Sequence, residues 1–220
     1  MQIVTFSTDD GVRLEGELRL PDGEVRGSAA ICHPHPKHGG SKDHPILWAL
    51  RNDLAGKRGM AVLAFNFRGV MGSGGAHGGG RDETRDVYAA VTRVREVAPN
   101  LPVVVCGWSF GASVALREGL DDHRPTALAL IGMPLRTNDL ALPPTPPASE
   151  LRTLRMPVLV LTGVNDPYCP VVEARAFVAS LPRGRLHVME GTDHYLWRRE
   201  REAASVVGAF VTDVMGQVAP

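Results

Sequence analysis

The sequence lacks the features that would place the chain in a membrane, in an oxidising compartment or on nucleic acid. No uninterrupted apolar stretch is long enough to span a bilayer, and the N-terminus has neither the basic nor the apolar region of a signal peptide. The three cysteines, an odd number, imply no disulfide framework. Acidic and basic residues number 24 each, so no electrostatic nucleic-acid surface is indicated. We therefore expect a cytoplasmic protein that binds neither nucleic acid nor membrane.

What the sequence does contain is an alternation of apolar strands and amphipathic helices. Residues 3–6 and 12–20 flank turn residues at 9–11 and predict a hairpin. Later apolar runs predict strands at 28–32, 61–65, 103–106, 126–131, 158–162 and 185–189, with helical patterns between them. This order predicts an α/β fold with a mostly parallel sheet, an antiparallel start and helices on both faces. A chain of 220 residues with 44% hydrophobic content fits a single domain over residues 1–220.

The pentapeptide Gly107-Trp108-Ser109-Phe110-Gly111 directly follows one of these strands. A G-x-S-x-G sequence at the end of a strand places its serine on a tight strand-to-helix turn, with the hydroxyl clear of the backbone. The flanking positions must be small because strand and helix pack closely around the turn, a demand that glycine meets. Residues 112–117 are typical of a helix, so strand, turn and helix are all present. We predict that Ser109 is a nucleophile and not an inert turn residue.

A serine hydroxyl is a weak nucleophile at neutral pH and needs a base, which in turn needs an orienting acid. In this kind of sheet, ligands lie at the carboxyl ends of the strands, so both partners should directly follow strands. Asp166 follows the strand at 158–162, and His194 follows the strand at 185–189. The order serine, acid, histidine is the order of α/β-hydrolases.

Other residues compete for these two roles. His187 is the only other histidine after the predicted acid, but it lies inside a predicted strand, where its ring points sideways from the sheet. Asp193 is adjacent to the predicted base, although neighbouring side chains usually diverge, and Asp139 is a weaker third choice for the acid. We therefore prefer His194 as the base and Asp166 as the acid.

An oxyanion hole needs two backbone N–H donors. Phe110 follows the nucleophile and should supply one of them. The second should come from the loop that begins at His33, where Pro34 and Pro36 have no N–H to give. His35 is then the nearest donor, and Lys37 is the next.

Several motifs together resemble those of a bacterial group of small α/β-hydrolases. They are the HPHP-x-x-GG-x-x-D segment at 33–43, the FNFRG-V-G-x-S element at 65–73, the G-x-S-F-G-A elbow at 107–112, and the acid and histidine loops at 163–166 and 191–194. The similarity covers nearly the whole chain. It implies the α/β-hydrolase fold and a triad of Ser109, Asp166 and His194. It implies no substrate, because the group is mostly described only as predicted hydrolases.

Two further segments have competing interpretations. The imidazoles of His33, His35, His38 and His44 are chemically suitable zinc ligands, but no carboxylate or cysteine pattern with ligand spacing accompanies them, so we expect no metal and no cofactor. The glycine-rich segment at 69–80 lacks the lysine-serine pair of a P-loop. We expect a flexible loop near the mouth of the site, with His77 on the surface. Met71 interrupts the expected glycine spacing of this loop.

The segment between the strands at 126–131 and 158–162 determines how the site is covered. It leaves room only for a small cap at 133–154, part of which is the proline-rich run at 142–147. We expect a fairly open active site that accepts esters of varied shape. Trp108 and Phe110 flank the nucleophile and could line an acyl pocket, or Trp108 could pack beneath the elbow.

The leading hypothesis is a serine hydrolase, and more specifically a carboxylesterase acting on a small-molecule acyl substrate. Ser109 would attack the carbonyl, His194 would take the serine proton and later activate water, and Asp166 would orient the imidazole. A thioesterase, amidase, peptidase or acyltransferase would use the same groups. A non-catalytic binding protein of this fold is the alternative of another class, although the chain has all three triad residues. A homodimer through the C-terminal helix or an exposed strand edge stays open.

Overall fold

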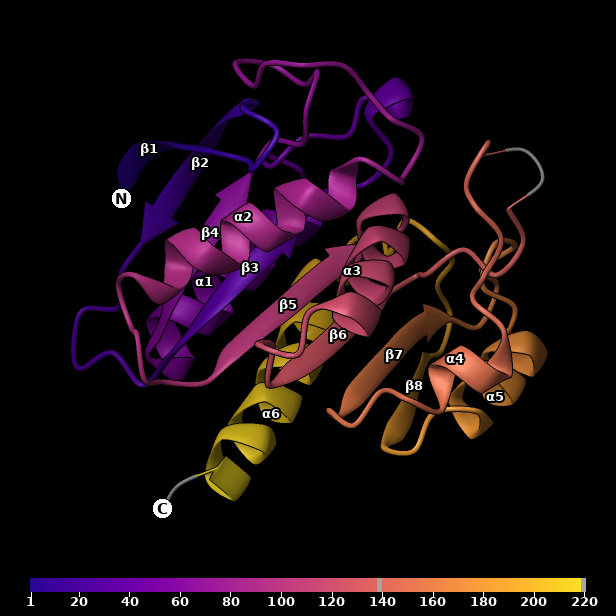
Figure 1. Cartoon of the computed structure of the whole chain (residues 1–220). Coiled ribbons are helices and arrows are strands. Elements are labelled where there is room, and N and C mark those ends of the chain that lie inside the picture. The colour runs from indigo at the N-terminus through magenta and orange to yellow at the C-terminus, as the bar shows by residue number, and fades with distance from the viewer. Residues whose placement is uncertain (138–139, 219–220) are drawn as a thin grey trace.

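The computed structural model describes residues 1–137 and 140–218, and within them it contains one eight-stranded mixed sheet (Figure 1). The strands are β1 (Gln2–Ser7), β2 (Arg13–Arg19), β3 (Gly27–Cys32), β4 (Met60–Phe65), β5 (Val103–Trp108), β6 (Ala127–Ile131), β7 (Val158–Gly163) and β8 (Gly184–Met189). Their spatial order is β1-β2-β4-β3-β5-β6-β7-β8. β2 pairs antiparallel with β1 and with β4, and the remaining neighbours are parallel. The predicted hairpin and parallel sheet are confirmed.

Helices cover both faces of this sheet (Figure 1). They are α1 (Pro45–Arg58), α2 (Glu83–Arg95), α3 (Phe110–Asp121), α4 (Ala148–Leu151), α5 (Val171–Ala179) and α6 (Glu200–Val218), with a 3-10 turn η1 (Pro36–His38). α1 and α6 pack against each other on one face, and α2, α3 and α5 lie on the other. A hydrophobic core lies on each face of the sheet, and alternate residues of a strand pack into one core or the other. Val105 of β5 packs on the side of α2 and α3, and Val104 packs on the side of α1 and α6.

The segment after β4 joins distant loops through buried polar groups. Asn66 accepts a hydrogen bond from the Lys42 N–H (2.8 Å) and donates to Glu15 (2.6 Å). Arg68 donates through Nε to Asp86 (2.9 Å) and through a terminal nitrogen to Asp10 (2.9 Å). The hydrogen bond from Arg68 lowers the pKa of Asp10 to about 2. The FNFRG motif therefore fixes the loops that precede the site.

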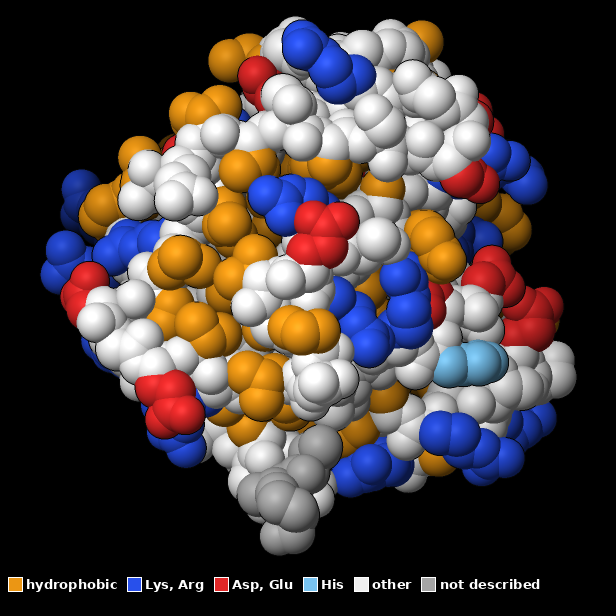
Figure 2. Space-filling view, turned by 60° about the vertical axis from the view of Figure 1, so that its left-hand side comes forward, with side chains coloured by type: hydrophobic (Ala, Val, Ile, Leu, Met, Phe, Trp, Pro, Cys, Tyr) orange, Lys and Arg blue, Asp and Glu red, His pale blue; other side chains and the backbone are white. Residues whose placement is uncertain are grey.

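The surface carries charges of both signs. On the face that Figure 2 shows, Lys and Arg side chains lie among Asp and Glu side chains, and hydrophobic side chains gather between them. Of the described helices, none is long and apolar enough to cross a membrane. Cys32, Cys106 and Cys169 are free, buried thiols. Asp139, the third choice for the acid, lies outside the described residues.

Candidate active site

The turn between β5 and α3 has the geometry that the pentapeptide predicts. Ser109 takes the unusual backbone angles φ 54° and ψ −119°, immediately before α3 begins. A Cβ atom at Gly107 would overlap the carbonyl oxygen of Gly111, and one at Gly111 would overlap the carbonyl oxygen of Cys32. Both glycines are required by this close approach of strand, turn and helix. The strained serine is held in place by its surroundings, as is typical of functional sites.

The structure brings the three predicted triad residues together. His194 Nε2 lies 2.9 Å from Ser109 Oγ, and His194 Nδ1 lies 2.9 Å from Asp166 Oδ2. Because a carboxylate only accepts hydrogen bonds, Nδ1 carries the imidazole proton and Nε2 is free to accept the serine proton. The side chains of His194 and Asp166 are 7% and 0% exposed, so bulk water does not compete for their hydrogen bond.

Asp166 is fixed by its own loop. Its Oδ1 accepts hydrogen bonds from the N–H groups of Tyr168 (2.9 Å) and Cys169 (3.0 Å), which leaves Oδ2 for the imidazole. Burial raises the pKa of the Cys169 thiol to about 12, so this residue stays an unreactive thiol at neutral pH. The competing Asp193 instead accepts a hydrogen bond from the Tyr195 N–H (2.9 Å) and stabilises a turn. His187 lies within β8.

Gly132 is a residue that the sequence reasoning missed. It follows β6 with a φ of 50°, and its N–H donates to the Leu161 carbonyl (2.7 Å). A Cβ atom here would lie 3.2 Å from both Asp166 Oδ2 and His194 Nδ1. The absence of a side chain therefore lets the backbone pass against the Asp–His pair. Its position directly after a predicted strand was the signal that could have found it.

Trp108 also has a role that the sequence left open. Its indole Nε1–H donates to the His194 carbonyl (3.2 Å), and its ring lies 4.2 Å from the His44 ring, centroid to centroid. Trp108 lines the pocket in front of Ser109, whereas Phe110 is fully buried and packs against Phe67 on the far side of the turn. Of the two aromatic neighbours of the serine, only Trp108 contributes to the pocket wall.

The loop that begins at His33 is held by its histidines. His33 is fully buried, donates through Nδ1 to the Pro34 carbonyl (2.6 Å) and accepts the Phe67 N–H at Nε2 (3.0 Å). Burial lowers its pKa to about 4, so it is neutral at physiological pH. His35 donates through Nε2 to the Leu140 carbonyl (3.2 Å) and accepts the Lys37 N–H at Nδ1 (3.2 Å).

These hydrogen bonds bear on the second oxyanion donor. The Lys37 N–H is already engaged by His35. By contrast, the N–H groups of His35 and Phe110 have no acceptor within residues 1–137 and 140–218. His35 lines the pocket beside Ser109, so its backbone N–H is the better placed of the two alternatives.

The histidines of this region pack against one another. Both ring nitrogens of His33 and of His35 are engaged in hydrogen bonds. No group of three or more His, Cys, Asp or Glu side chains is placed to hold a metal ion in the parts of the chain that the structure describes.

The expectation of a surface position for His77 is wrong, because its side chain is only 13% exposed and packs against His35 and Phe110. The reason is that His77 of the glycine-rich segment packs against the loop residue His35 and against Phe110 of α3.

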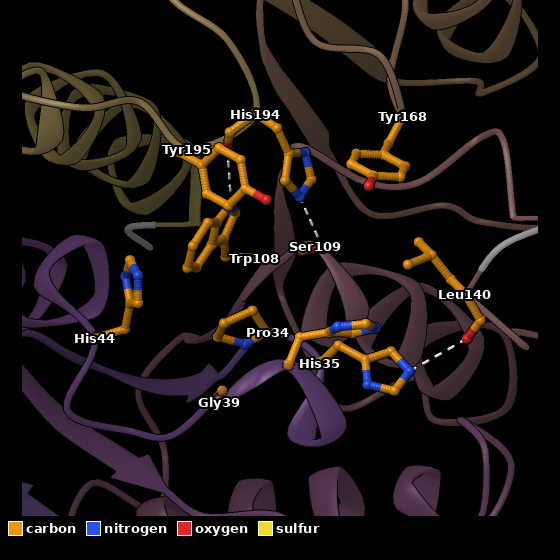
Figure 3. A pocket seen from close by; sticks show the side chains of 12 residues that line it. Pro34, His35, Gly39, His44, Trp108, Ser109, Leu140, Tyr168, His194 and Tyr195 are labelled. Carbon is orange, nitrogen blue, oxygen red and sulfur yellow. Dashed lines mark hydrogen bonds between the residues drawn. The ribbon is translucent and has the colours of Figure 1, made fainter.

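A pocket of about 170 Å³ lies in front of the serine (Figure 3). Trp108, Tyr195 and His44 lie on one side of Ser109, and Tyr168 and Leu140 lie on the other. His38 and Gly39, which are exposed, also line it, so one side opens to solvent. The segment between β6 and β7 contributes Leu140 to the wall and contains one short described helix, α4. The expected minimal cap is confirmed.

Comparisons with known proteins agree with this architecture. Residues 30–216 match the family described as Alpha/beta hydrolase domain. An α/β serine hydrolase homologue from Coxiella burnetii is 25% identical, with a TM-score of 0.81 over 99% of this chain and 97% of that one. A Xanthomonas campestris α/β serine hydrolase without a lid is 24% identical (TM-score 0.77; 100% and 95% covered). The Pyrococcus furiosus esterase Pf2001 is 21% identical (TM-score 0.82; 98% and 93% covered).

Proposed function

Because the chain belongs to the Alpha/beta hydrolase domain family, we propose that it is a carboxylesterase in which Ser109, His194 and Asp166 form the catalytic triad. The observation that carries the proposal is the continuous chain of hydrogen bonds from Ser109 Oγ through the imidazole to Asp166, at 2.9 Å for each step. A non-catalytic protein of the same fold has no need to hold a buried histidine in this tautomer. The fold by itself does not establish the activity, so the argument rests on the site.

The reaction follows from this geometry. As Ser109 Oγ attacks the ester carbonyl carbon, its proton passes to His194 Nε2, and Asp166 stabilises the imidazolium that forms. The carbonyl oxygen becomes an oxyanion, which the N–H groups of Phe110 and His35 stabilise. Collapse of this intermediate breaks the bond to the alcohol oxygen, which takes the proton from Nε2. A water molecule then gives a proton to Nε2 as its oxygen attacks the carbonyl carbon of the acyl-serine. The bond from that carbon to Ser109 Oγ breaks, Oγ takes the proton back from Nε2, and the acid is released.

An ester bond is favoured over an amide bond by the openness of the site. His38 and Gly39 leave one side of the pocket exposed, so a released alcohol has a direct path to solvent. The segment between β6 and β7 adds only the short helix α4 as a described element, so the site gains little further binding surface from a cap. The fold is shared with a protein named as an esterase, which agrees with this reading.

The free, buried thiols support a reducing compartment such as the cytoplasm as the place of action.

The first test is labelling of the purified protein with a fluorophosphonate probe, with Ser109→Ala as the control. We expect labelling of the wild type and none of the variant. The two proteins are then compared on an ester, an amide and a thioester that share one acyl group. A higher kcat/KM on the ester supports a carboxylesterase, and a higher value on the amide or thioester would reassign the leaving group. An unlabelled but folded wild-type protein would contradict hydrolase activity altogether.

A further inference from the structure

The pocket beside Ser109 is walled mainly by flat rings. Trp108 and His44 are tilted against each other, with 4.2 Å between their ring centroids and an interplanar angle of 46°. Tyr195 and Tyr168 contact the His194 ring from opposite sides, with centroids 5.6 Å and 4.9 Å away (Figure 3). These rings offer both faces and edges to an aromatic ring of a ligand. Aromatic pairs prefer offset-stacked or edge-to-face contacts, so such a ring could be accommodated between them.

The pocket also has no charged wall. Among the described residues that line it there is no Asp, Glu, Lys or Arg. Burial lowers the pKa of His35 and of His44, so both rings are neutral at neutral pH. A charged group placed among these rings would lose part of its hydration without gaining a partner of opposite charge. The part of the substrate that enters the pocket is therefore uncharged.

The size of the pocket limits its occupant. It measures about 170 Å³, and an apolar cavity of about 150 Å³ accommodates benzene. One aromatic ring with a short link to the carbonyl fills this space, whereas a long acyl chain extends beyond it. The volume of the pocket and the uncharged, ring-lined wall thus both favour a single uncharged aromatic ring.

The loop after His194 holds an aromatic pair at the edge of this pocket. Leu196 is 1% exposed and takes a φ of 52°, a left-handed conformation that a leucine rarely adopts. This buried residue anchors the loop and leaves its neighbours Tyr195 and Trp197 at 49% and 66% exposure. Their rings lie 6.3 Å apart with an interplanar angle of 31°. The loop therefore presents Tyr195 to the pocket, and the Trp197 ring packs near the Tyr195 ring.

We propose that the preferred substrates are esters whose acyl group carries one uncharged aromatic ring, bound between Trp108, Tyr195 and His44. The inference rests on the proposed esterase function. The ring belongs to the acyl group because Trp108 directly precedes Ser109, the residue that carries the acyl group in the intermediate. Tyr195 is then a residue that determines specificity, and its ring contributes mainly to the choice among acyl groups.

The test compares methyl esters, so that no ring is present in the leaving group. We expect kcat/KM for methyl phenylacetate to exceed that for methyl butyrate and methyl octanoate by about tenfold, since a matched pocket favours its ligand by this order. A 4-carboxy substituent on the phenylacetyl ring should remove the advantage. Tyr195→Leu should lower the ratio of phenylacetate to butyrate about fivefold, as loss of an aromatic pair does. Tyr195→Phe should keep the ratio, and Trp48→Leu, at an exposed tryptophan outside this pocket, should leave it unchanged.

The inference would be overturned by a preference for methyl octanoate, or by a phenylacetate-to-butyrate ratio that Tyr195→Leu does not change. A preference for benzyl acetate over hexyl acetate without any acyl preference would also contradict it, because the ring would then bind on the alcohol side. Labelling of Ser109 by the fluorophosphonate probe separates the two proposals. A labelled enzyme without a ring preference contradicts only this inference, and an unlabelled one contradicts the esterase function.

Discussion

Trp108 and His194 are joined by a hydrogen bond from the indole Nε1–H to the backbone carbonyl oxygen, 3.2 Å long, across 86 positions of the sequence. Both residues are buried. Trp108 directly precedes Ser109, so this bond ties the nucleophile turn to the backbone of the loop that carries the base, in addition to the bond between the Ser109 and His194 side chains. This connection helps to hold Nε2 at 2.9 Å from Ser109 Oγ.

Replacing Trp108 with phenylalanine should therefore lower catalysis more than stability. Loss of one buried hydrogen bond costs about 1 kcal/mol, but a small displacement of the histidine loop should lower kcat about tenfold, because catalysis depends on near-attack geometry. Steady-state kinetics on a short-chain ester and urea unfolding give the two quantities. Trp48→Phe, at an exposed tryptophan of α1, is the matched control. An unchanged kcat in Trp108→Phe would show that the bond does not position His194.

Gly132→Ala should damage the site through a specific steric contact. The added methyl group would press on Asp166 Oδ2 and His194 Nδ1, both 3.2 Å away. The left-handed backbone alone costs an alanine about 1 kcal/mol of stability. Gly79→Ala carries the same backbone cost, since Gly79 has a φ of 68°, but its nearest neighbour is 3.8 Å away. We expect similar losses in unfolding free energy and a loss of kcat of at least about tenfold only in Gly132→Ala.

Equal kinetics in the two glycine variants would contradict this account of Gly132. The account would gain further support if Gly132→Ala lost activity and its pH–rate profile also shifted. The methyl group would then weaken the hydrogen bond between His194 and Asp166 and change the apparent pKa of the base.

The triad and the sheet could be predicted because their signals are local. A strand followed by Gly-x-Ser-x-Gly fixes Ser109, and the positions just after later strands fix Asp166 and His194. The contacts of Trp108 with His194 and of His35 with Leu140 join residues 86 and 105 positions apart, and no pattern in the sequence encodes such pairs. Side-chain contacts of this range depend on the packed structure, so only the coordinates reveal them.

Met71 shows the limit of reading a loop from glycine spacing. It occupies a left-handed conformation with a φ of 50°, and its side chain is 75% exposed. The turn keeps its shape because the Ser73 N–H donates to the Val70 carbonyl (2.9 Å). A backbone hydrogen bond thus compensates for the absence of glycine at this position, and the sequence pattern alone could not reveal that compensation.

His33 should make the stability of the protein depend on pH in the acid range. Its pKa is lowered from 6.5 to about 4 by burial, so between these values the unfolded chain binds a proton that the folded chain does not. Stability is then fully present above pH 6.5 and is lost as the pH falls toward 4. The loss is about 2 to 3 kcal/mol. His33→Gln keeps a donor and an acceptor without the titration, so its unfolding free energy should fall less between pH 7 and pH 4.

Urea unfolding at a series of pH values checks this difference. His123→Gln serves as the control, because His123 is an exposed histidine and its replacement should leave the pH dependence of wild type in place. If the unfolding free energies of wild type and His33→Gln fell equally with decreasing pH, the buried imidazole would not be the cause of the loss of stability in acid.

Glu118, on α3, should give the opposite pH dependence: it should make the protein less stable as the pH rises. It is 5% exposed, its Oε1 has no hydrogen-bond partner among the described residues, and burial together with Asp122 raises its pKa from 4.5 to about 8. Between these values the folded state keeps a proton that the unfolded state loses, so this group lowers stability as the pH rises from 4.5 to 8. Glu118→Gln removes the titration and should be more stable than wild type by about 2 to 4 kcal/mol at pH 8, with the difference vanishing near pH 4.5.

The measurement is the unfolding free energy of wild type and Glu118→Gln at pH 5 and pH 8, with the exposed Glu24→Gln as the control. A gain that is equal at both pH values would mean that the amide improves packing or hydrogen bonding and that ionisation is not the cause. A loss at pH 8 would mean that the carboxylate is ionised and stabilised in the folded state, contrary to its burial. Only a gain in unfolding free energy that grows with pH agrees with a protonated Glu118 carboxyl group on the buried side of the nucleophile helix α3.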